Sequence, residues 1–147
     1  MTLMERHKKA AEILPAVSSL VGGERYAGAS AGSFDHINPA TGQAQASIPL
    51  SGTDCVDAAV AAARSAAAGW RNTPGSRRRE ILEKLAELIM RNGEELATIS
   101  TLENGATMGF GATRFVSMAA EWTRYYAGWA DKLDGLVVDT HRDQPLV

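Results

Sequence analysis

Apolar and polar positions alternate at helical spacing through most of the second half of the chain. Small apolar residues recur every three or four positions between Val56 and Trp70, which predicts a long helix with Thr53 as its N-cap. Asp54 and Asp57 fall in its first turns, where the helix dipole favours carboxylates. The many alanines would let this helix pack closely against a neighbour.

Two further amphipathic helices follow. The turn at residues 73–76 ends in Ser76, which we expect to cap a helix with a wide apolar stripe over residues 81–89. Asn92-Gly93 predicts a break, after which the helical rhythm resumes and ends at Asn104-Gly105, a pair that tolerates left-handed backbone. A third helix is predicted from about Ala112 to Lys132, closed by Gly135.

The third helix carries the most apolar face in the chain. Its members recur at helical spacing: Phe115, Met118, Ala119, Trp122, Tyr125, Tyr126 and Trp129. A platform for stacking nucleic-acid bases is the alternative, but such platforms are surrounded by basic residues, which this face lacks. We therefore predict that the aromatic residues form core.

The first 50 residues have a different sequence pattern. A short apolar pattern over residues 2–14, ended by Pro15, predicts a helix within a leader of residues 1–19. Turn residues then punctuate short extended segments, and we expect hairpins, one of them with arms at 34–37 and 43–48 around residues 38–42. At the other end of the chain, the apolar residues from Leu136 begin a β-rich segment.

Composition narrows the classes of function. The 147 residues carry a net charge of −2, so they offer no positive field for nucleic acid or an anionic membrane. Cys55 is the only cysteine, which excludes an internal disulfide and a cysteine-based zinc cluster and fits a reducing compartment. We find no signal-peptide pattern and no apolar run of membrane-spanning length, and we expect a cytoplasmic protein.

An ordered series of motifs resembles the aldehyde dehydrogenase superfamily. These are INPATG at 37–42, AVAAARSAAAGWRNTPGSRRREILEKLAELI at 59–89, TLENG at 101–105 and RYYAGWADK at 124–132. The resemblance runs from about Val21 to the end and covers about the first third of a family member. It implies an α/β, aldehyde dehydrogenase-like fold. Residues 20–135, hairpins and then three amphipathic helices, would belong to the Rossmann-like cofactor domain, and residues 136–147 would begin the oligomerisation β arm.

The resemblance also implies a reaction. In the family a cysteine thiolate attacks the aldehyde, hydride passes to NAD or NADP, and a glutamate-activated water releases the acid. Those residues and the dinucleotide-binding loop lie downstream in family members. We therefore expect no catalytic or cofactor-binding residue among these 147, an inactive chain in isolation, and a homodimer or homotetramer at full length. The alternatives are a non-enzymatic helical interaction module and a truncated, inactive gene product.

Two features that resemble catalytic or cofactor-binding motifs have ordinary structural explanations. Cys55 lies in the first turn of a helix, where the dipole favours a thiolate, but no histidine is near it in sequence and it does not match the family's catalytic cysteine. We expect it to be replaceable by serine or alanine. Gly105, Gly109 and Gly111 lie between helices and do not fit the dinucleotide-binding spacing, so we interpret them as turn glycines.

The resemblance suggests two candidate sites. Glu103 matches an acidic residue that helps to bind a monovalent cation in some family members. The other ligands there are backbone carbonyls, which would here belong to His36 and Ile37. Hard cations prefer such oxygen ligands. Arg114 and Met118, one helical turn apart, match positions that line the aldehyde entrance, where Arg114 would attract an aldehyde bearing a carboxylate. The family usually continues the NG turn with Lys-Pro, whereas this chain has Ala106-Thr107, which leaves the substrate undecided.

Overall fold

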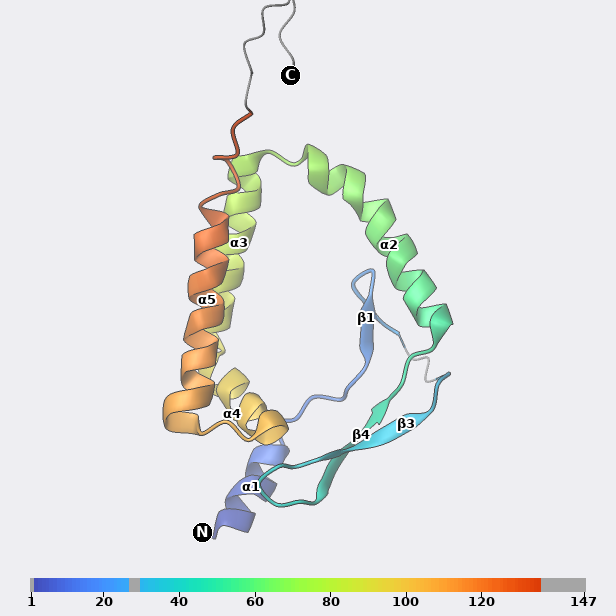
Figure 1. Ribbon diagram of the computed structural model, residues 1–147, viewed down its shortest axis with the longest axis vertical. Helices are drawn as coiled ribbons and strands as arrows, with labels where there is room; N and C mark the ends of the chain where they lie inside the picture. The colour runs from blue at the N-terminus through green and yellow to red at the C-terminus, as the bar shows by residue number, and fades with distance from the viewer. Residues whose placement is uncertain (1, 27–29, 136–147) are drawn as a thin grey trace, which may run out of the picture.

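The computed structural model describes residues 2–26 and 30–135, a mixture of helices and two small sheets (Figure 1). The elements in order are α1 (Leu3–Ala11), β1 (Ser19–Val21), β2 (Glu24–Tyr26), β3 (Ser33–Ile37), β4 (Ala44–Pro49), α2 (Thr53–Asn72), α3 (Gly75–Arg91), α4 (Gly93–Asn104), the π-helix η1 (Met108–Ala112) and α5 (Thr113–Ala127). Helices α3 and α5 lie side by side, whereas α2 diverges from them (Figure 1). The segment predicted to start the β arm lies outside the described residues. None of the described helices is long and apolar enough to cross a membrane.

Both hairpins form as two-stranded antiparallel sheets, which confirms the prediction for this region. The first turns at Gly22 and Gly23, whose φ angles of 62° and 91° lie in the left-handed region that glycine tolerates. In the second, Phe34 faces Ile48 across the ladder, and a bulge interrupts the register between His36 and Ile37. The strand arms therefore agree with prediction to within a residue.

The two predicted helix caps were wrong. The N-cap of α2 is Gly52, and Thr53 is the first helical residue; the backbone N–H of Gly52 donates to Ser30 Oγ at 3.1 Å. The N-cap of α3 is Pro74, so Ser76 lies inside the first turn. A tertiary contact explains the second difference, because a Cβ on Gly75 would come within 2.6 Å of the Ala130 carbonyl oxygen. The close approach of these two segments places glycine, not serine, at the start of the helix.

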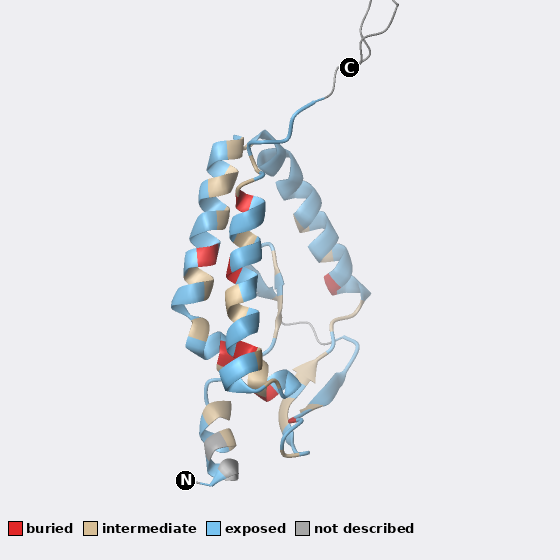
Figure 2. Ribbon diagram, turned by 60° about the vertical axis from the view of Figure 1, so that its left-hand side comes forward, coloured by how far each residue is buried: buried red, intermediate tan, exposed pale blue. Residues whose placement is uncertain are grey.

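Small residues, not aromatic ones, form the contact between α3 and α5. Ala86 of α3 and Ala120 and Ala127 of α5 are completely buried. Figure 2 shows buried positions, in red, on the facing sides of neighbouring helices, and α3 and α5 are in contact. The prediction of an aromatic core was wrong for the described chain, since Trp122 is 54% exposed and Tyr126 is 58% exposed. Helix axes approach closely where small residues lie between them, whereas the large rings of α5 remain at the surface.

The ends of α4 and α5 agree with the predicted helix ends only in part. The predicted break at Asn92-Gly93 separates α3 from α4, and α4 ends at Gly105, whose φ of 77° is left-handed as expected. Helix α5 is shorter than predicted, because it ends at Ala127 with Gly128 as C-cap and a turn follows. Gly109 and Gly111 belong to η1 and not to a simple turn.

Helix α1 lies within the predicted leader and is four residues shorter than the apolar pattern over residues 2–14 suggested. Thr2 and Glu5 form a capping box, in which the Thr2 side chain accepts from the Glu5 N–H and the Glu5 carboxylate accepts from the Thr2 N–H. Helix α1 packs against α4. The N-terminal residues are therefore in contact with the part of the chain that carries the candidate cation ligands.

Candidate functional site

The turn between β3 and β4 is organised by Asn38, a polar residue that is only 4% exposed. Its Oδ1 accepts from the backbone N–H groups of Ala40 and Thr41, at 2.9 and 3.2 Å. Its backbone N–H donates to the Gln43 carbonyl, and its carbonyl accepts from the Gly42 N–H, both at 2.8 Å. A short polar side chain that bonds to the backbone two and three residues ahead is the reason this sequence turns here.

Gln45 of β4 joins this turn to the C-terminus of α4. Its Nε2 donates to the Leu102 carbonyl at 2.7 Å and its Oε1 accepts from Asn38 Nδ2 at 2.8 Å. The Leu102 carbonyl is one of the last four in α4, which have no partner within the helix, so Gln45 supplies the missing donor. Next to this bond, the position of a Cβ on Gly105 is 3.2 Å from Pro39 Cγ.

These contacts bring the segments with the three candidate cation ligands to one place. His36 and Ile37 lie at the bulge of β3, and Glu103 lies, exposed, in the last turn of α4, beside Leu102. The His36 imidazole is engaged with Gln45, because its Nδ1 lies 2.9 Å from Gln45 Nε2. The role of the His36 carbonyl as a cation ligand stays a prediction. Within the described ranges, no three His, Cys, Asp or Glu side chains are grouped as metal ligands.

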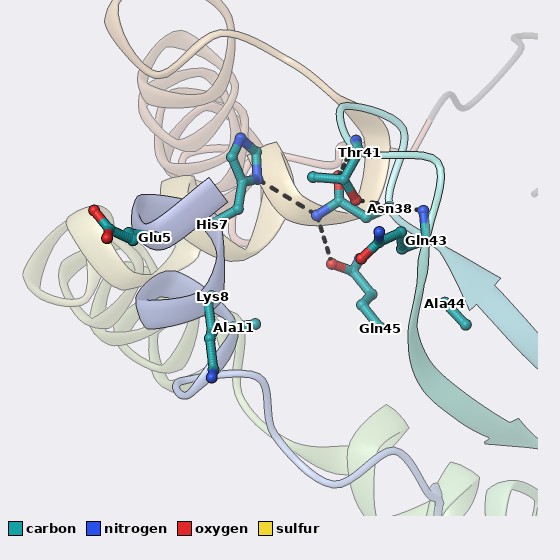
Figure 3. Close-up of a pocket in the computed structure, with 9 residues that line it drawn as sticks. All are labelled: Glu5, His7, Lys8, Ala11, Asn38, Thr41, Gln43, Ala44 and Gln45. Atoms are coloured by element: carbon teal, nitrogen blue, oxygen red, sulfur yellow. Dashed lines mark hydrogen bonds between the residues drawn. The ribbon is translucent and has the colours of Figure 1, made fainter. Parts of the chain in front are cut away.

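An open hollow of about 360 Å³ lies between α1 and this turn (Figure 3). From α1 it is lined by Glu5, His7 and Lys8, and from the hairpin by the uncharged side chains around Asn38. Figure 3 shows the His7 ring directed at the Asn38 amide, and its Nδ1 lies 3.4 Å from Asn38 Nδ2. Nothing in the local sequence pattern around His7 indicates this distant partner.

The N-terminus of α2 holds a second polar cluster, next to Cys55. The Tyr26 and Ser30 hydroxyls donate to the two carboxylate oxygens of Asp54, at 3.0 and 2.6 Å. Both hydrogen bonds lower the pKa of Asp54, and the bond from Ser30 has the larger effect. The bond to Asp54 in turn raises the pKa of Tyr26. Cys55 itself is 4% exposed and forms no disulfide. A buried thiol is poorly placed for nucleophilic chemistry, which is consistent with the interpretation as an ordinary helix residue.

The candidate entrance residues lie on the exposed side of α5. Arg114 Nη1 pairs with Glu121 Oε1 at 3.2 Å, and both side chains are more than half exposed. Met118 lies between them in sequence and is 36% exposed. A hollow of about 270 Å³ between the α3–α4 junction and the start of α5 is lined by neither Arg114 nor Met118. The two residues therefore face away from the other helices, and Arg114 already has an anionic partner.

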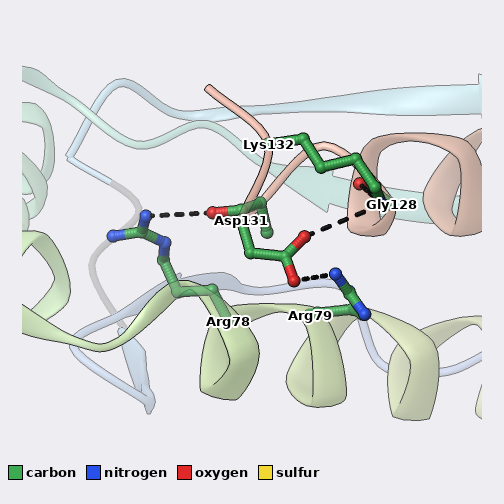
Figure 4. A network of polar contacts seen from close by, with 6 residues as sticks. Arg78, Arg79, Gly128, Asp131 and Lys132 are labelled. Carbon is green, nitrogen blue, oxygen red and sulfur yellow. Dashed lines mark hydrogen bonds and ion pairs between the residues drawn. The ribbon is translucent and has the colours of Figure 1, made fainter. Parts of the chain in front are cut away.

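Three consecutive arginines in α3 have different partners, which the sequence did not indicate. The Arg78 guanidinium donates to the carbonyls of Arg71, Thr73 and Ala130, at 3.4, 3.1 and 3.3 Å. Arg79 pairs with Asp131 in the turn after α5 (Figure 4). This pair of arginines thus connects the end of α2, the start of α3 and the end of α5. Arg77 forms an exposed pair with Glu80.

The exposed aromatic residues border the largest of these hollows. It has a volume of about 510 Å³ and is lined by Trp70, Arg78, Leu82, Tyr125, Tyr126, Trp129, Ala130 and Leu133. Trp122 and Tyr126 stack with ring centroids 5.9 Å apart, and Tyr125 contacts both edge to face. The arrangement is a largely apolar surface, and the Arg78 guanidinium at its border is engaged with backbone carbonyls.

Gly109 and Gly111 do not form the glycine-rich cradle that holds the phosphates of a dinucleotide. Phosphate cradles are glycine-rich turns that lead from a strand into a helix, where backbone N–H groups point at the phosphates. Gly109 and Gly111 instead follow α4 and lie in η1, so they continue a helical path. A Cβ on Gly111 would lie 3.1 Å from Ala106 Cβ, which accounts for this glycine by packing.

Comparison with known proteins places these features in one family. Residues 26–146 match the model of the aldehyde dehydrogenase family. The phenylacetaldehyde dehydrogenase of Pseudomonas fluorescens is 39% identical over 122 residues, which are 82% of this chain and 24% of that protein. The aldehyde dehydrogenase of Alternaria alternata is 42% identical over 111 residues, which are 75% of this chain and 22% of that protein.

Solved structures agree with the sequence relatives. The NAD-dependent aldehyde dehydrogenase from Sinorhizobium meliloti superposes with a TM-score of 0.81 at 32% identity, over 91% of this chain and 27% of that one. HpcC from Thermus thermophilus superposes with a TM-score of 0.82 at 27% identity, over 95% of this chain and 27% of that one. The chain thus spans about a quarter of the length of these relatives and has the N-terminal part of their α/β fold. It belongs to the aldehyde dehydrogenase family.

Proposed function

We propose that these residues are the N-terminal segment of an enzyme that oxidises an aldehyde to a carboxylic acid with NAD or NADP, through a cysteine thiohemiacetal. The observation that carries the proposal is the family match over residues 26–146, in a chain that spans 24% of a phenylacetaldehyde dehydrogenase. The catalytic cysteine, the general-base glutamate and the dinucleotide-binding loop would then be supplied from outside these 147 residues, and the assembled enzyme would be a cytoplasmic homodimer or homotetramer.

Within that enzyme the segment would have a structural role, and alone it would be inactive. The support is the exposed apolar surface around Trp122 and Tyr126, which no described element covers. Exposed apolar surfaces of this kind normally contact another part of the protein or a partner. The same surface is what would support the alternative, a non-enzymatic helical interaction module.

The proposed entrance role of Arg114 and Met118 depends on the side of α5 on which they lie. Both are exposed on this helix and would be available to a substrate passage formed with the rest of the enzyme. Arg114 would pair bidentately with a carboxylate on the aldehyde, and Glu121 would compete with that carboxylate for the guanidinium. The proposed substrate class is therefore an aldehyde that carries an anionic group.

The proposed monovalent cation site comprises the carbonyls of His36 and Ile37 together with Glu103. Its support is the network through Gln45, which holds the β3–β4 turn against the last turn of α4. Oxygen ligands from a backbone bulge and one carboxylate suit a hard cation. If the site forms in the enzyme, Glu103→Gln will weaken the dependence of activity on Na⁺ or K⁺.

A chimera tests the enzymatic proposal. Residues 26–146 replace the matching segment of the Pseudomonas fluorescens phenylacetaldehyde dehydrogenase, and formation of reduced cofactor is measured with NAD and NADP. We expect an active chimera and an inactive 147-residue chain. Turnover by the chain alone, or a soluble, folded chimera without activity, would contradict the proposal.

The same chimera tests the entrance. Arg114→Ala should raise KM for an anionic aldehyde by about tenfold, the loss of one charge-assisted hydrogen bond, and leave KM for a neutral aldehyde unchanged. Glu121→Gln should lower KM for the anionic aldehyde, because it removes the competitor. Equal effects on both aldehydes would show that Arg114 acts only on the fold. A sharp, monomeric, cooperatively melting 147-residue chain would instead favour the interaction module.

A further inference from the structure

The amide orientations in the Asn38 network are fixed by backbone partners. Asn38 Oδ1 accepts from two backbone N–H groups, so the atom that faces Gln45 and His7 is Nδ2, which can only donate. Gln45 Nε2 donates to the Leu102 carbonyl, so its Oε1 is the atom that faces Asn38. Neither side chain can be turned over without placing two donors or two acceptors in contact.

This orientation defines which form of His7 can accept a hydrogen bond from Asn38. Asn38 Nδ2 carries two hydrogens, one given to Gln45 Oε1 and the other directed at His7 Nδ1, 3.4 Å away. His7 Nδ1 must therefore be an acceptor, which requires a neutral imidazole with its proton on Nε2. Protonation of His7 would place an N–H group against the Asn38 N–H and remove the bond.

The charges around His7 do not replace that bond. On α1 itself Glu5 and Lys8 border the same hollow, and the hairpin side is uncharged. From α4, Glu94 and Glu95 lie near Ile13, beyond the other end of α1, and Glu103 lies exposed in the last turn. None of these carboxylates has a hydrogen bond to His7 among the described contacts, so a charged imidazole gains no new partner in place of Asn38.

We propose that α1 is an acid-sensitive latch on the β3–β4 turn, closed while His7 is neutral and released when the imidazole takes a proton. Helix α1 lies N-terminal to residues 26–146, the part that matches the family model. Its release would open the hollow beside Asn38. It would also uncover the region of α4 against which α1 packs.

Hydrogen exchange measured by mass spectrometry tests the latch on the 147-residue chain at low concentration. Exchange of the α1 peptide is compared with that of α3, each corrected for the intrinsic rate, between about pH 8 and pH 5, where histidine changes charge. We expect the protection of α1 to fall by about tenfold, the value of one hydrogen bond, while the protection of α3 stays constant. Equal losses in α1 and α3 would indicate general acid unfolding and overturn the proposal.

Two variants assign the effect to His7. His7→Asn places a side-chain oxygen near the position of Nδ1, where it accepts from Asn38 but does not titrate, so α1 should stay protected at both pH values. Lys8→Gln, which removes a neighbouring charge on the same helix, should keep the pH response. A pH response that survives His7→Asn would overturn the latch. An α1 peptide that is unprotected in every form would do the same.

Discussion

Replacing Arg78 by alanine should destabilise the chain far more than replacing its neighbour Arg77. Arg78 donates to the carbonyls of Arg71, Thr73 and Ala130 from a half-buried position. A hydrogen bond from a charged donor contributes about 1.5–3 kcal/mol at best. Because two of these three are long and all are partly solvated, we expect a total loss of about 2–3 kcal/mol.

Arg77 is the matched control, since it is also an arginine in the first turns of α3. Its pair with Glu80 spans one helical turn, and the two side chains are 64% and 61% exposed. Pairs of this kind contribute about 0–0.5 kcal/mol, so Arg77→Ala should be nearly neutral. Arg78→Lys should recover little of the loss, because one compact ammonium group cannot reproduce the planar guanidinium that donates to the end of α2 and to Ala130 at once.

Urea unfolding followed by circular dichroism gives the free energies, and tryptophan fluorescence reports the local effect. Trp70 and Trp129 line the same hollow as Arg78, so their emission should change in Arg78→Ala and not in Arg77→Ala. If the two alanine variants unfold within about 0.5 kcal/mol of each other, the reasoning about the three carbonyls is refuted.

Other variants test the turn, the glycines and the charge at the start of α2. Gln45→Ala should cost about 2–3 kcal/mol in urea unfolding, because it leaves a buried amide and a helix-end carbonyl unpaired, whereas Gln43→Ala, at an exposed position two residues away, should be nearly neutral. Gly105→Ala should cost about 1–2 kcal/mol because of its φ of 77°, while Gly69→Ala, in the open interior of α2, should stabilise by about 0.5–1 kcal/mol, both measured by thermal melts. The pKa of Asp54 lies below its ordinary value of 3.8, so the ionised Asp54 stabilises the fold above pH 3.8, and this stabilisation is lost as the pH falls through the lowered pKa. Asp54→Asn should abolish this part of the loss of stability in acid, measured as the free energy of unfolding against pH. The 147-residue chain should self-associate at high concentration through its aromatic surface, and a concentration-independent monomer in analytical ultracentrifugation would contradict this.

Local patterns predicted the elements of this fold well, because their causes are local. The glycine pairs set the turns, Asn92-Gly93 separates α3 from α4, and the left-handed Gly105 ends α4. The burial of each helix face was not predictable in the same way. On α5 the aromatic stripe is the most apolar, yet Ala120 and Ala127 make the contact with α3, because the distance between two helices depends on the smallest residues between them.

The contacts that build the site depend on residues far apart in sequence. The INPATG motif predicted a turn, and Asn38 forms it. The residue that connects this turn to α4 is Gln45, whose side chain donates to the Leu102 carbonyl, 57 residues further along the chain. The sequence pattern does not distinguish Gln45 from Gln43. It also does not show that the second of three adjacent arginines, Arg78, donates hydrogen bonds to three backbone carbonyls. Polar residues of one type are distinguished only by what the fold places opposite them.

The Gln45 bond also has a consequence for the proposed entrance. It fixes the last turn of α4, from which the chain passes through Gly105 into η1 and then directly into α5, where Arg114 lies in the first turn. Helix η1 contacts α4 and α5, so a shift at the end of α4 is transmitted to Arg114 with little chain in between to absorb it. Gln45→Ala in the chimera should therefore alter KM for an anionic aldehyde more than for a neutral one, although residue 45 would touch neither. An equal change for both aldehydes would mean that the β3–β4 turn stabilises the fold without orienting the entrance.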